Sequence, residues 1–461
     1  MVGDASRLAV WLGIWGIALA VIAIVRWRRS IGGVGLTLTY LVQLTAFHGV
    51  GAAIYLFPWD WTGSDPGMVE LGLEQTVYGL LGFGVGAVVI APFVARLFGV
   101  TKNIAVTTAP EPTLAKVYFA VGILFYLLSA TFLGRIPTVS AVIGTGRAFL
   151  LVGLGLSAWV ALRSAKKFAF LAWVAAAMWL PLFTLISAGF LGFGAIALVM
   201  VVTLLVSLRG IGPRGALLAM LCVYLGLSIY VTYMRDRRDI RDVVWTGGDL
   251  TARFQKVEDM VRAFEWFDPY DTDHLERIDS RLNQNTLVGA AVDYIASNPD
   301  AFARGETVLE AFWALVPRII WPDKPMAAGS GTWVSRYTGI TFEENTSVGM
   351  GQVLEFYINF GTAGVVIGFL LLGTVIASVD SIARSRVVVG DWPGFVLWYV
   401  PGTALLQAGG SLMEITSSAA AAAVAAMLIN RYVFLRLRPQ APAAATQDSL
   451  AMSSGGAASW C

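Results

Sequence analysis

VPRIIWPDKP, residues 316–325, lies near the end of a long polar interval (residues 234–346) in an otherwise almost wholly apolar chain. With 57% hydrophobic residues, 13% charged residues and a mean hydropathy of +0.70, the 461-residue chain is too apolar for a soluble globular protein. Runs of about 20 apolar residues, the length that a helix needs to cross the hydrocarbon core, recur on both sides of the interval. The sequence therefore predicts an all-α bundle of membrane helices with one large, mostly helical external loop.

The apolar runs predict about eleven spans, eight before the loop and three after it. These spans cover residues 8–25, 34–57, 76–97, 117–133, 148–162, 168–186, 190–208, 215–233, 348–378, 392–409 and 412–430. The chain then divides into N-terminal membrane helices (1–233), the loop (234–346), C-terminal membrane helices (347–433) and a tail (434–461). The tail is rich in Ala, Ser and Gly and is expected to be disordered and cytoplasmic.

Basic residues predict the orientation of the bundle. Alternating spans place sixteen Lys and Arg residues on one side: Arg26, Arg28, Arg29, Arg96, Lys102, Lys116, Arg163, Lys166, Lys167, Arg209, Arg214, Arg384, Arg386, Arg431, Arg436 and Arg438. Apart from the loop, the other side has only Arg7, Arg135 and Arg147. By the positive-inside rule, the N-terminus and the loop are outside and the C-terminus is inside. The segment 187–194 is read as a tight outer turn between two spans.

Several kinds of site find no support in the sequence. Cys222 and Cys461 provide neither a disulfide framework nor a metal-ligand spacing. Acidic residues show no spacing that demands a metal. We therefore expect no metal and no cofactor, and the net charge of +2 gives no reason to expect a nucleic-acid partner.

Polar side chains inside the predicted spans gather toward the outer side. Glu355 and Glu414 are the only acids in the spans, and the i, i+3, i+7 spacing of Gln352, Glu355 and Asn359 places these three on one helix face. Ionisable groups in hydrocarbon usually face a cavity or one another. We therefore expect the second, ninth, tenth and eleventh spans to enclose a polar vestibule beneath the loop. For His48 alone, a hydrogen bond that links neighbouring helices is the preferred interpretation.

The loop shows three helical patterns, over residues 252–267, 287–296 and 306–316. After the third, prolines restrict the backbone around Arg318 and Lys324. Arginine pairs with phosphate through two parallel hydrogen bonds and lysine supplies a point charge, so this segment is a candidate phosphate site. Ion pairs with loop carboxylates are the alternative. Trp321 suits a sugar platform or a membrane-interface anchor equally well.

A series of short motifs carries a resemblance to a known family. The motifs are Arg281-Leu282, Asn298-Pro299, Gly305-Glu306-Thr307, Pro317-Arg318, Trp321-Pro322-Asp323-Lys324-Pro325 and Glu355-Phe356-Tyr357-Ile358-Asn359-Phe360-Gly361. Together they resemble the signature series of bacterial oligosaccharide repeat-unit polymerases, the Wzy or O-antigen polymerase family. The resemblance covers about residues 277–364, and the spans on either side match only in hydropathy. Family members often have about twelve spans with both termini inside, from which this chain departs.

The resemblance implies a glycosyltransferase of the plasma membrane, similar in fold to GT-C-type enzymes. A glycan on undecaprenyl diphosphate would be transferred to a lipid-linked repeat unit outside the membrane, with release of undecaprenyl diphosphate. The implied partners are the lipid-linked donor and acceptor, membrane lipid, a chain-length regulator and a flippase. The implied bases are Glu355 and His274. The candidate diphosphate- or substrate-binding residues are Arg318, Lys324, Arg281, Arg336, Arg135, Trp321, Asn359 and Gln352.

Three alternatives remain open on the sequence. An O-antigen ligase shares the lipid-diphosphate donor but passes the glycan to the lipid A core. A transporter or flippase for a polar lipid would also need polar groups in the membrane, although the two halves of this chain show no convincing internal repeat. A non-catalytic membrane scaffold would leave the polar residues of the outer side without a purpose.

Overall fold

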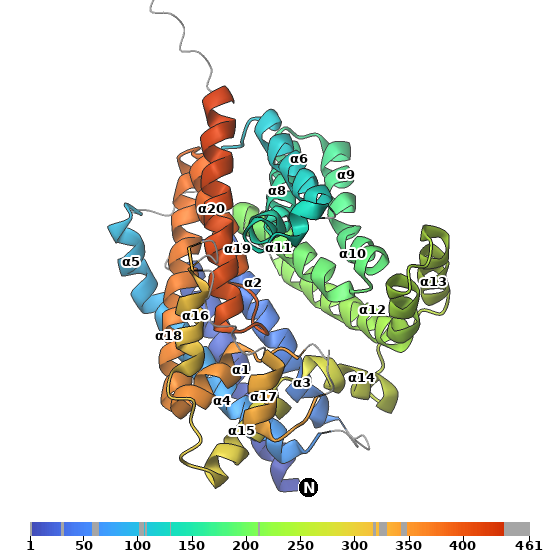
Figure 1. Ribbon diagram of the computed structural model, residues 1–461, viewed down its shortest axis with the longest axis vertical. Helices are drawn as coiled ribbons and strands as arrows, with labels where there is room; N and C mark the ends of the chain where they lie inside the picture. Colours follow the sequence, from blue (N-terminus) through green and yellow to red (C-terminus); the bar gives the residue numbers. More distant parts are fainter. Residues whose placement is uncertain are drawn as a thin grey trace, which may run out of the picture.

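The computed structural model describes residues 2–28, 32–57, 64–100, 106, 108–129, 131–210, 213–316, 320–321, 330–342 and 348–437. Regular structure in these ranges is entirely helical. Nine stretches within them are long and apolar enough to cross a membrane, so the chain is a multi-pass membrane protein. Figure 1 shows the start of α1 (Val2–Arg28) and the end of α20 (Leu412–Leu437) at opposite ends of the molecule.

Nine of the predicted spans correspond to the candidate spans of the structure. These are Ser6–Arg26, Leu36–Leu56, Pro66–Leu97, Pro112–Ser129, Val139–Arg163, Lys167–Ala188, Leu191–Arg209, Gln352–Val388 and Leu412–Tyr432. The predicted tight turn is also present, since α10 (Leu180–Ala188) and α11 (Leu191–Arg209) are joined through Gly189 at a φ of 75°. The predicted span at 215–233 lies in α12 (Pro213–Trp245), whose first side chains are outside the described residues, and it stays a prediction.

The prediction of a full-length helical span at 392–409 is wrong. α19 (Trp392–Ala404) has only 13 residues, which at about 1.5 Å per residue spans roughly 20 Å and is shorter than the hydrocarbon core. The chain continues as turns through residues 405–411 to reach α20. Irregular backbone inside a membrane protein needs hydrogen-bond partners from the protein itself, and Gln352 provides two of them.

α18 (Gln352–Val388) is the central helix of the bundle and packs along α4 (Pro66–Val85) and α19. Its backbone leaves helical geometry at Phe360 and at Gly361, where φ is 64°. A side chain at that φ is unfavourable by about 1–2 kcal/mol, so glycine suits the break. The predicted ninth span is therefore a short helical segment followed by a long helix, and Glu355 lies in the short segment.

Asp380, on the long part of α18, joins the ends of two other helices. Its carboxylate accepts hydrogen bonds from the backbone N–H of Val34 (2.7 Å) and Leu36 (3.1 Å) and from the hydroxyl of Thr37 (2.7 Å). It also pairs with Arg26 at the end of α1 (3.2 Å). The residue is 1% exposed, and these bonds satisfy the first N–H groups of α2 (Leu36–Leu44).

The expectation that Glu355 and Glu414 are the only acids inside the spans is wrong. The spans of the structure are longer than predicted, and they also include Asp380, Glu70 and Glu74. Sequence reasoning placed these residues in loops because it ended each apolar run at the first charge. A buried carboxylate extends a span when its partners lie within hydrogen-bond distance, as they do at Asp380.

In the described part of the polar interval, five helices follow the end of α12, and three of them were predicted. The patterns at 252–267, 287–296 and 306–316 correspond to α13 (Leu250–Arg262), α15 (Asn285–Ser297) and α16 (Glu306–Ala314). α13 ends earlier than predicted. The sequence analysis missed α14 (Thr272–Leu282) and α17 (Ser330–Thr338). In Figure 1, α14, α15 and α17 lie toward the same end of the molecule as the start of α1.

The interval is packed tightly on the membrane helices. α15 lies along α4, and a Cβ atom at Gly289 would collide with the carbonyl of Met68. His48, in a π-helical turn (Thr45–Gly49) of the second span, meets Asn285 through its Nδ1 atom (2.9 Å to Oδ1). The Asn285 amide in turn donates to the His48 carbonyl (2.8 Å). His48 therefore links a membrane helix to the interval. This confirms the interpretation of His48 as a residue that hydrogen-bonds neighbouring helices together.

The predicted domain limits do not coincide with breaks in the helices. α12 runs without interruption across residues 233 and 234, so the interval begins inside a helix. At the other end, α20 continues to Leu437, beyond the expected start of the tail at residue 434. Residues 438–461 of the predicted tail lie outside the described residues.

We expect Asp380→Ala to destabilise the protein by about 3 kcal/mol or more, because it leaves Arg26 buried without its ion-pair partner and uncaps α2. The thermal unfolding midpoint of the purified protein in detergent measures the effect. Asp65→Ala is the matched control, since Asp65 caps α4 from an exposed position and its loss should cost about 1 kcal/mol. Equal midpoints for the two variants would contradict the role given to Asp380.

Candidate functional site

Gln352, Glu355 and Asn359 lie together on the short first segment of α18, as their spacing predicts. The Glu355 carboxylate accepts a hydrogen bond from the backbone N–H of Leu412 (2.6 Å) at the start of α20. Asn359 accepts one from the Gly305 N–H (2.8 Å) and donates one to the Thr307 hydroxyl (2.8 Å), both at the start of α16. Glu355 and Asn359 therefore join the first turns of α20 and α16, respectively, to α18.

Gln352 completes this junction. Its amide group donates to the carbonyls of Gln407 and Gly410 (2.6 Å each), and its side-chain oxygen accepts from the Tyr40 hydroxyl (3.1 Å). The second, ninth, tenth and eleventh spans meet here, but they do not enclose an open vestibule around these residues. Gln352, Glu355 and Asn359 are 0%, 1% and 2% exposed, because buried polar groups in an apolar bundle pair with one another.

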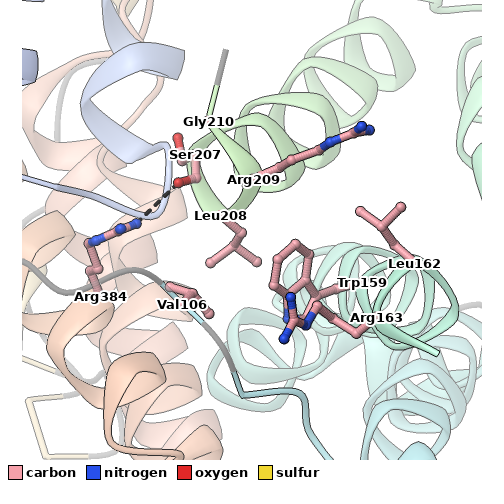
Figure 2. Close-up of a pocket in the computed structure, with 9 residues that line it drawn as sticks. All are labelled: Val106, Trp159, Leu162, Arg163, Ser207, Leu208, Arg209, Gly210 and Arg384. Carbon is pink, nitrogen blue, oxygen red and sulfur yellow. Dashed lines mark hydrogen bonds between the residues drawn. The ribbon is translucent and has the colours of Figure 1, made fainter. Parts of the chain in front are cut away.

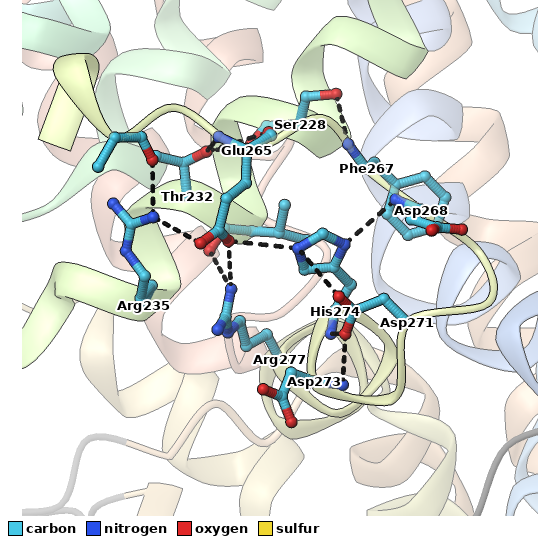
Figure 3. Close-up of polar contacts among 12 residues, drawn as sticks. Ser228, Thr232, Arg235, Glu265, Phe267, Asp268, Asp271, Asp273, His274 and Arg277 are labelled. Carbon is cyan, nitrogen blue, oxygen red and sulfur yellow. Dashed lines mark hydrogen bonds and ion pairs between the residues drawn. The ribbon is translucent and has the colours of Figure 1, made fainter.

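His274, the second candidate base, lies in a different cluster at the junction of α12 and α14 (Figure 3). The backbone N–H of Asp268 donates to its Nδ1 atom (3.1 Å), so the ring proton is on Nε2, which donates to Glu265 (3.2 Å). Both ring nitrogens are thus occupied. Its polar contacts are with residues of the interval, and none of them connects it to Glu355.

Glu265 is the centre of that cluster. It accepts hydrogen bonds from Arg235 (2.6 Å), Arg277 (2.8 Å) and His274 (3.2 Å), and Figure 3 shows all three side chains converging on its carboxylate. Burial raises the pKa of Glu265, but these hydrogen bonds outweigh it and bring the pKa down to about 2. The arrangement is a closed ion-pair network in which the charges compensate one another.

A different arrangement surrounds Arg281, at the end of α14. Its side chain is accessible, yet burial and then the positive charge of Arg237 lower the pKa of its guanidinium. In the part of the chain that the structure describes, no carboxylate forms an ion pair with Arg237 or Arg281. Both arginines act electrostatically on Tyr230, whose hydroxyl is buried and has no hydrogen-bond partner there. Two cations without a carboxylate partner, together with an unsatisfied buried hydroxyl, form a candidate anion site.

We call the group of Arg237, Arg281 and Tyr230 the Arg237–Arg281 site. A third arginine, Arg241, is coupled electrostatically to it. Burial lowers the pKa of Arg241, and the charges of Arg237 and Arg281 lower it further. Its guanidinium lies 4.3 Å from the centroid of the Phe190 ring and donates weakly to the carbonyl of Gly189 (3.4 Å) in the turn between α10 and α11. Arg241 thereby fixes the end of α12 against that turn.

Sequence reasoning identified Arg281 but missed Arg237 and Tyr230. Arg237 stands in a run of charged residues that reads as a solvated helix face, and Tyr230 reads as part of an apolar span. Their only sequence signal is the i, i+7 spacing, which puts both on the α12 face that meets α14.

The other predicted residues that the structure describes, Arg336, Arg135 and Trp321, belong to neither cluster. Arg336 lies near Glu306 (3.9 Å) and over the rings of Trp333 and Tyr337. Arg135 is exposed in a short turn after the fourth span. Trp321 is 38% exposed and Arg318 and Lys324, which flank it, lie outside the described residues.

Comparison with protein families assigns the chain to one family. Residues 91–394 match a family that is described as a domain of unknown function, DUF8712. The chain belongs to this family. The matched range includes the Arg237–Arg281 site, the Glu265 network and Glu355. Searches of curated proteins and of solved structures find no match.

We expect Glu355→Ala to destabilise the protein by about 2 kcal/mol, because it leaves the Leu412 N–H at the start of α20 buried without a partner. Glu355→Gln retains an acceptor oxygen and should unfold within a few degrees of the wild type. If Glu355 is also a base, the Gln variant will fold normally and make no polymer. A Gln variant that makes full-length polymer limits Glu355 to its structural role.

Acid should loosen the α12–α14 junction. The pKa of Glu265 is about 2 in the folded protein against 4.5 ordinarily, so its carboxylate stabilises the fold above about pH 4.5. This stabilisation, about 3 kcal/mol at most, is lost as the pH falls from 4.5 toward 2. The protection factors of residues 264–277, which compare their hydrogen-exchange rates with those of the unfolded chain at the same pH, should therefore fall over that range in the wild type, and be low at every pH in Glu265→Gln. Glu258→Gln, at an exposed pair with Arg262, should behave as the wild type.

Proposed function

We propose that this protein is a membrane glycosyltransferase that polymerises lipid-diphosphate-linked oligosaccharide repeat units on the outer face of a bacterial plasma membrane. The observation that carries the proposal is the Arg237–Arg281 site, whose two cations act electrostatically on the buried and unsatisfied Tyr230 hydroxyl. The motif resemblance to repeat-unit polymerases supplies the reaction, and the site supplies a place for the anionic group of the substrate.

The chemistry of the site suits a diphosphate. Arginine offers planar pairs of N–H donors that match phosphate oxygens, and the Tyr230 hydroxyl adds a further donor. Burial and then the charge of Arg237 lower the pKa of the Arg281 guanidinium, so a ligand with more than one negative charge would relieve the repulsion between the two cations. The Glu265 network nearby, in contrast, has already paired its cations with a carboxylate.

The surroundings of the site suit a lipid. The part of α12 that precedes Tyr230 exposes a series of large apolar side chains: Met220, Leu221, Val223, Leu225 and Ile229. Exposed apolar side chains of this kind are favourable in contact with acyl or prenyl chains and unfavourable in contact with water. A prenyl chain lying along this face would carry its diphosphate to the level of Arg237 and Arg281, at the end of α12 that enters the polar interval.

In the proposed reaction, a hydroxyl oxygen of the acceptor sugar forms a bond to the anomeric carbon of the donor glycan. The bond between that carbon and the diphosphate oxygen breaks, and prenyl diphosphate leaves with the electron pair. Arg237 and Arg281 stabilise the negative charge that develops on the leaving group. The hydroxyl proton passes to a base.

The geometry gives less support to the two proposed bases than to the cations. His274 uses both ring nitrogens within its own cluster, and Glu355 is closed off at the start of α20. The proposal therefore depends on binding and orientation of the diphosphate and not on an identified base. Arg318 and Lys324 stay candidate partners of the same anion.

Single substitutions at the site test the proposal. We expect Arg237→Ala and Arg281→Ala each to weaken binding of a prenyl diphosphate, such as farnesyl diphosphate, to the purified protein by about tenfold or more. In cells, both variants should accumulate single repeat units. Arg238→Ala is the matched control, because Arg238 is the exposed neighbour of Arg237 on the same helix and no described residue forms an ion pair with it.

Other outcomes would favour the alternatives. Normal polymer on the lipid carrier with none on the lipid A core would indicate a ligase. Loss of lipid-linked units from the outer leaflet would indicate a flippase. Wild-type binding and chain length in both arginine variants would contradict the proposal.

A further inference from the structure

A second cationic cavity lies at the other end of the bundle, between the ends of α8 (Gly146–Arg163), α11 and α18 (Figure 2). Its volume is about 400 Å³. Arg163, Arg209 and Arg384 line it, together with apolar side chains that include Leu162 and Leu208. Among its described lining residues there is no acidic side chain.

The three arginines are held in different ways. Arg384 donates to the carbonyls of Ser207 (3.1 Å) and Gly33 (3.2 Å) and so fixes the wall of the cavity. Arg163 lies over the Trp159 ring, 5.8 Å from its centroid. Arg209 ends α11 and is exposed, and no described residue forms a hydrogen bond or ion pair with it.

The position of the cavity fits the surface of a membrane. Arg163 and Arg209 are the last residues of two candidate spans, so their guanidinium groups lie where hydrocarbon gives way to headgroups. Arg384 is 29 positions after Glu355 along α18, or roughly 40 Å at 1.5 Å per residue. The cavity and the Glu355 junction are therefore near opposite faces of the membrane.

Basic residues at helix ends also have a purely structural explanation, because they complement the negative end of the helix dipole. That explanation accounts for Arg163 and Arg209 individually. It does not account for an open space of this volume with a fixed third arginine and an apolar wall. A ligand with a negative head and an apolar tail satisfies all of these features together.

We propose that this cavity binds the phosphate of an anionic phospholipid headgroup, with the first part of an acyl chain against Leu162 and Leu208. The site is independent of the proposed glycosyltransferase reaction and lies on the predicted cytoplasmic side. Bound lipid holds the ends of α8 and α11 to α18, which already bonds to the end of α11 through the Arg384 side chain.

The test uses the full-length protein in nanodiscs of phosphatidylcholine with and without phosphatidylglycerol. Native mass spectrometry measures how much phosphatidylglycerol stays bound. We expect Arg209→Ala to weaken retention roughly fivefold and Arg163→Ala with Arg209→Ala roughly 30-fold, at about one factor of five per arginine near a membrane surface. Arg96→Ala is the matched control, since Arg96 also ends a helix and lies over an aromatic ring, Phe93, but does not line the cavity.

Two results would overturn the proposal. Unchanged retention in the double variant would show that the cavity does not hold the headgroup. Displacement of phosphatidylglycerol by millimolar inorganic phosphate, with equal protection against thermal unfolding, would assign the cavity to a soluble phosphate. Should the double variant fail to fold, Arg209→Ala alone decides, because Arg209 is exposed and no described residue bonds to it.

Discussion

The carboxylate of Asp380 is the constraint on which the membrane bundle depends. A buried charge is costly unless its lone pairs are satisfied, and here they are satisfied by the first N–H groups of α2 and by Arg26 of α1. Because those groups come from two parts of the chain and Asp380 itself comes from a third, the cost of burying Asp380 is offset only where all three parts meet. α1, α2 and α18 are thereby fixed in register at one end of the bundle.

The other end of α18 is fixed by neutral and acidic side chains together. Glu355 holds the start of α20, Asn359 holds the start of α16, and Gln352 satisfies the irregular backbone that completes the short α19. This junction explains why a 13-residue helix is sufficient at that position. The same closure means that Gln352, Glu355 and Asn359 serve the architecture directly.

The polar interval is held against the membrane helices by buried pairs such as His48 with Asn285 and by the close contact of α15 with α4. It contains two contrasting groups of charge. Around Glu265 the cations are neutralised by a carboxylate, whereas Arg237 and Arg281 have no such partner among the described residues. The two arginines therefore resemble a binding site for an anion, whereas the paired charges around Glu265 resemble a structural network.

Sequence alone determined the membrane helices, the polar interval and the shared helix face of Gln352, Glu355 and Asn359, because hydropathy and helical spacing are local properties. It also singled out Arg281. Only the tertiary structure decided what these residues meet. Asp380 and Arg26 are 354 positions apart, and the packing of α12 on α14 brings Arg281 under the electrostatic influence of Arg237. Such pairings depend on which helices become neighbours, and this is settled by the summed packing of the bundle and not by any local pattern.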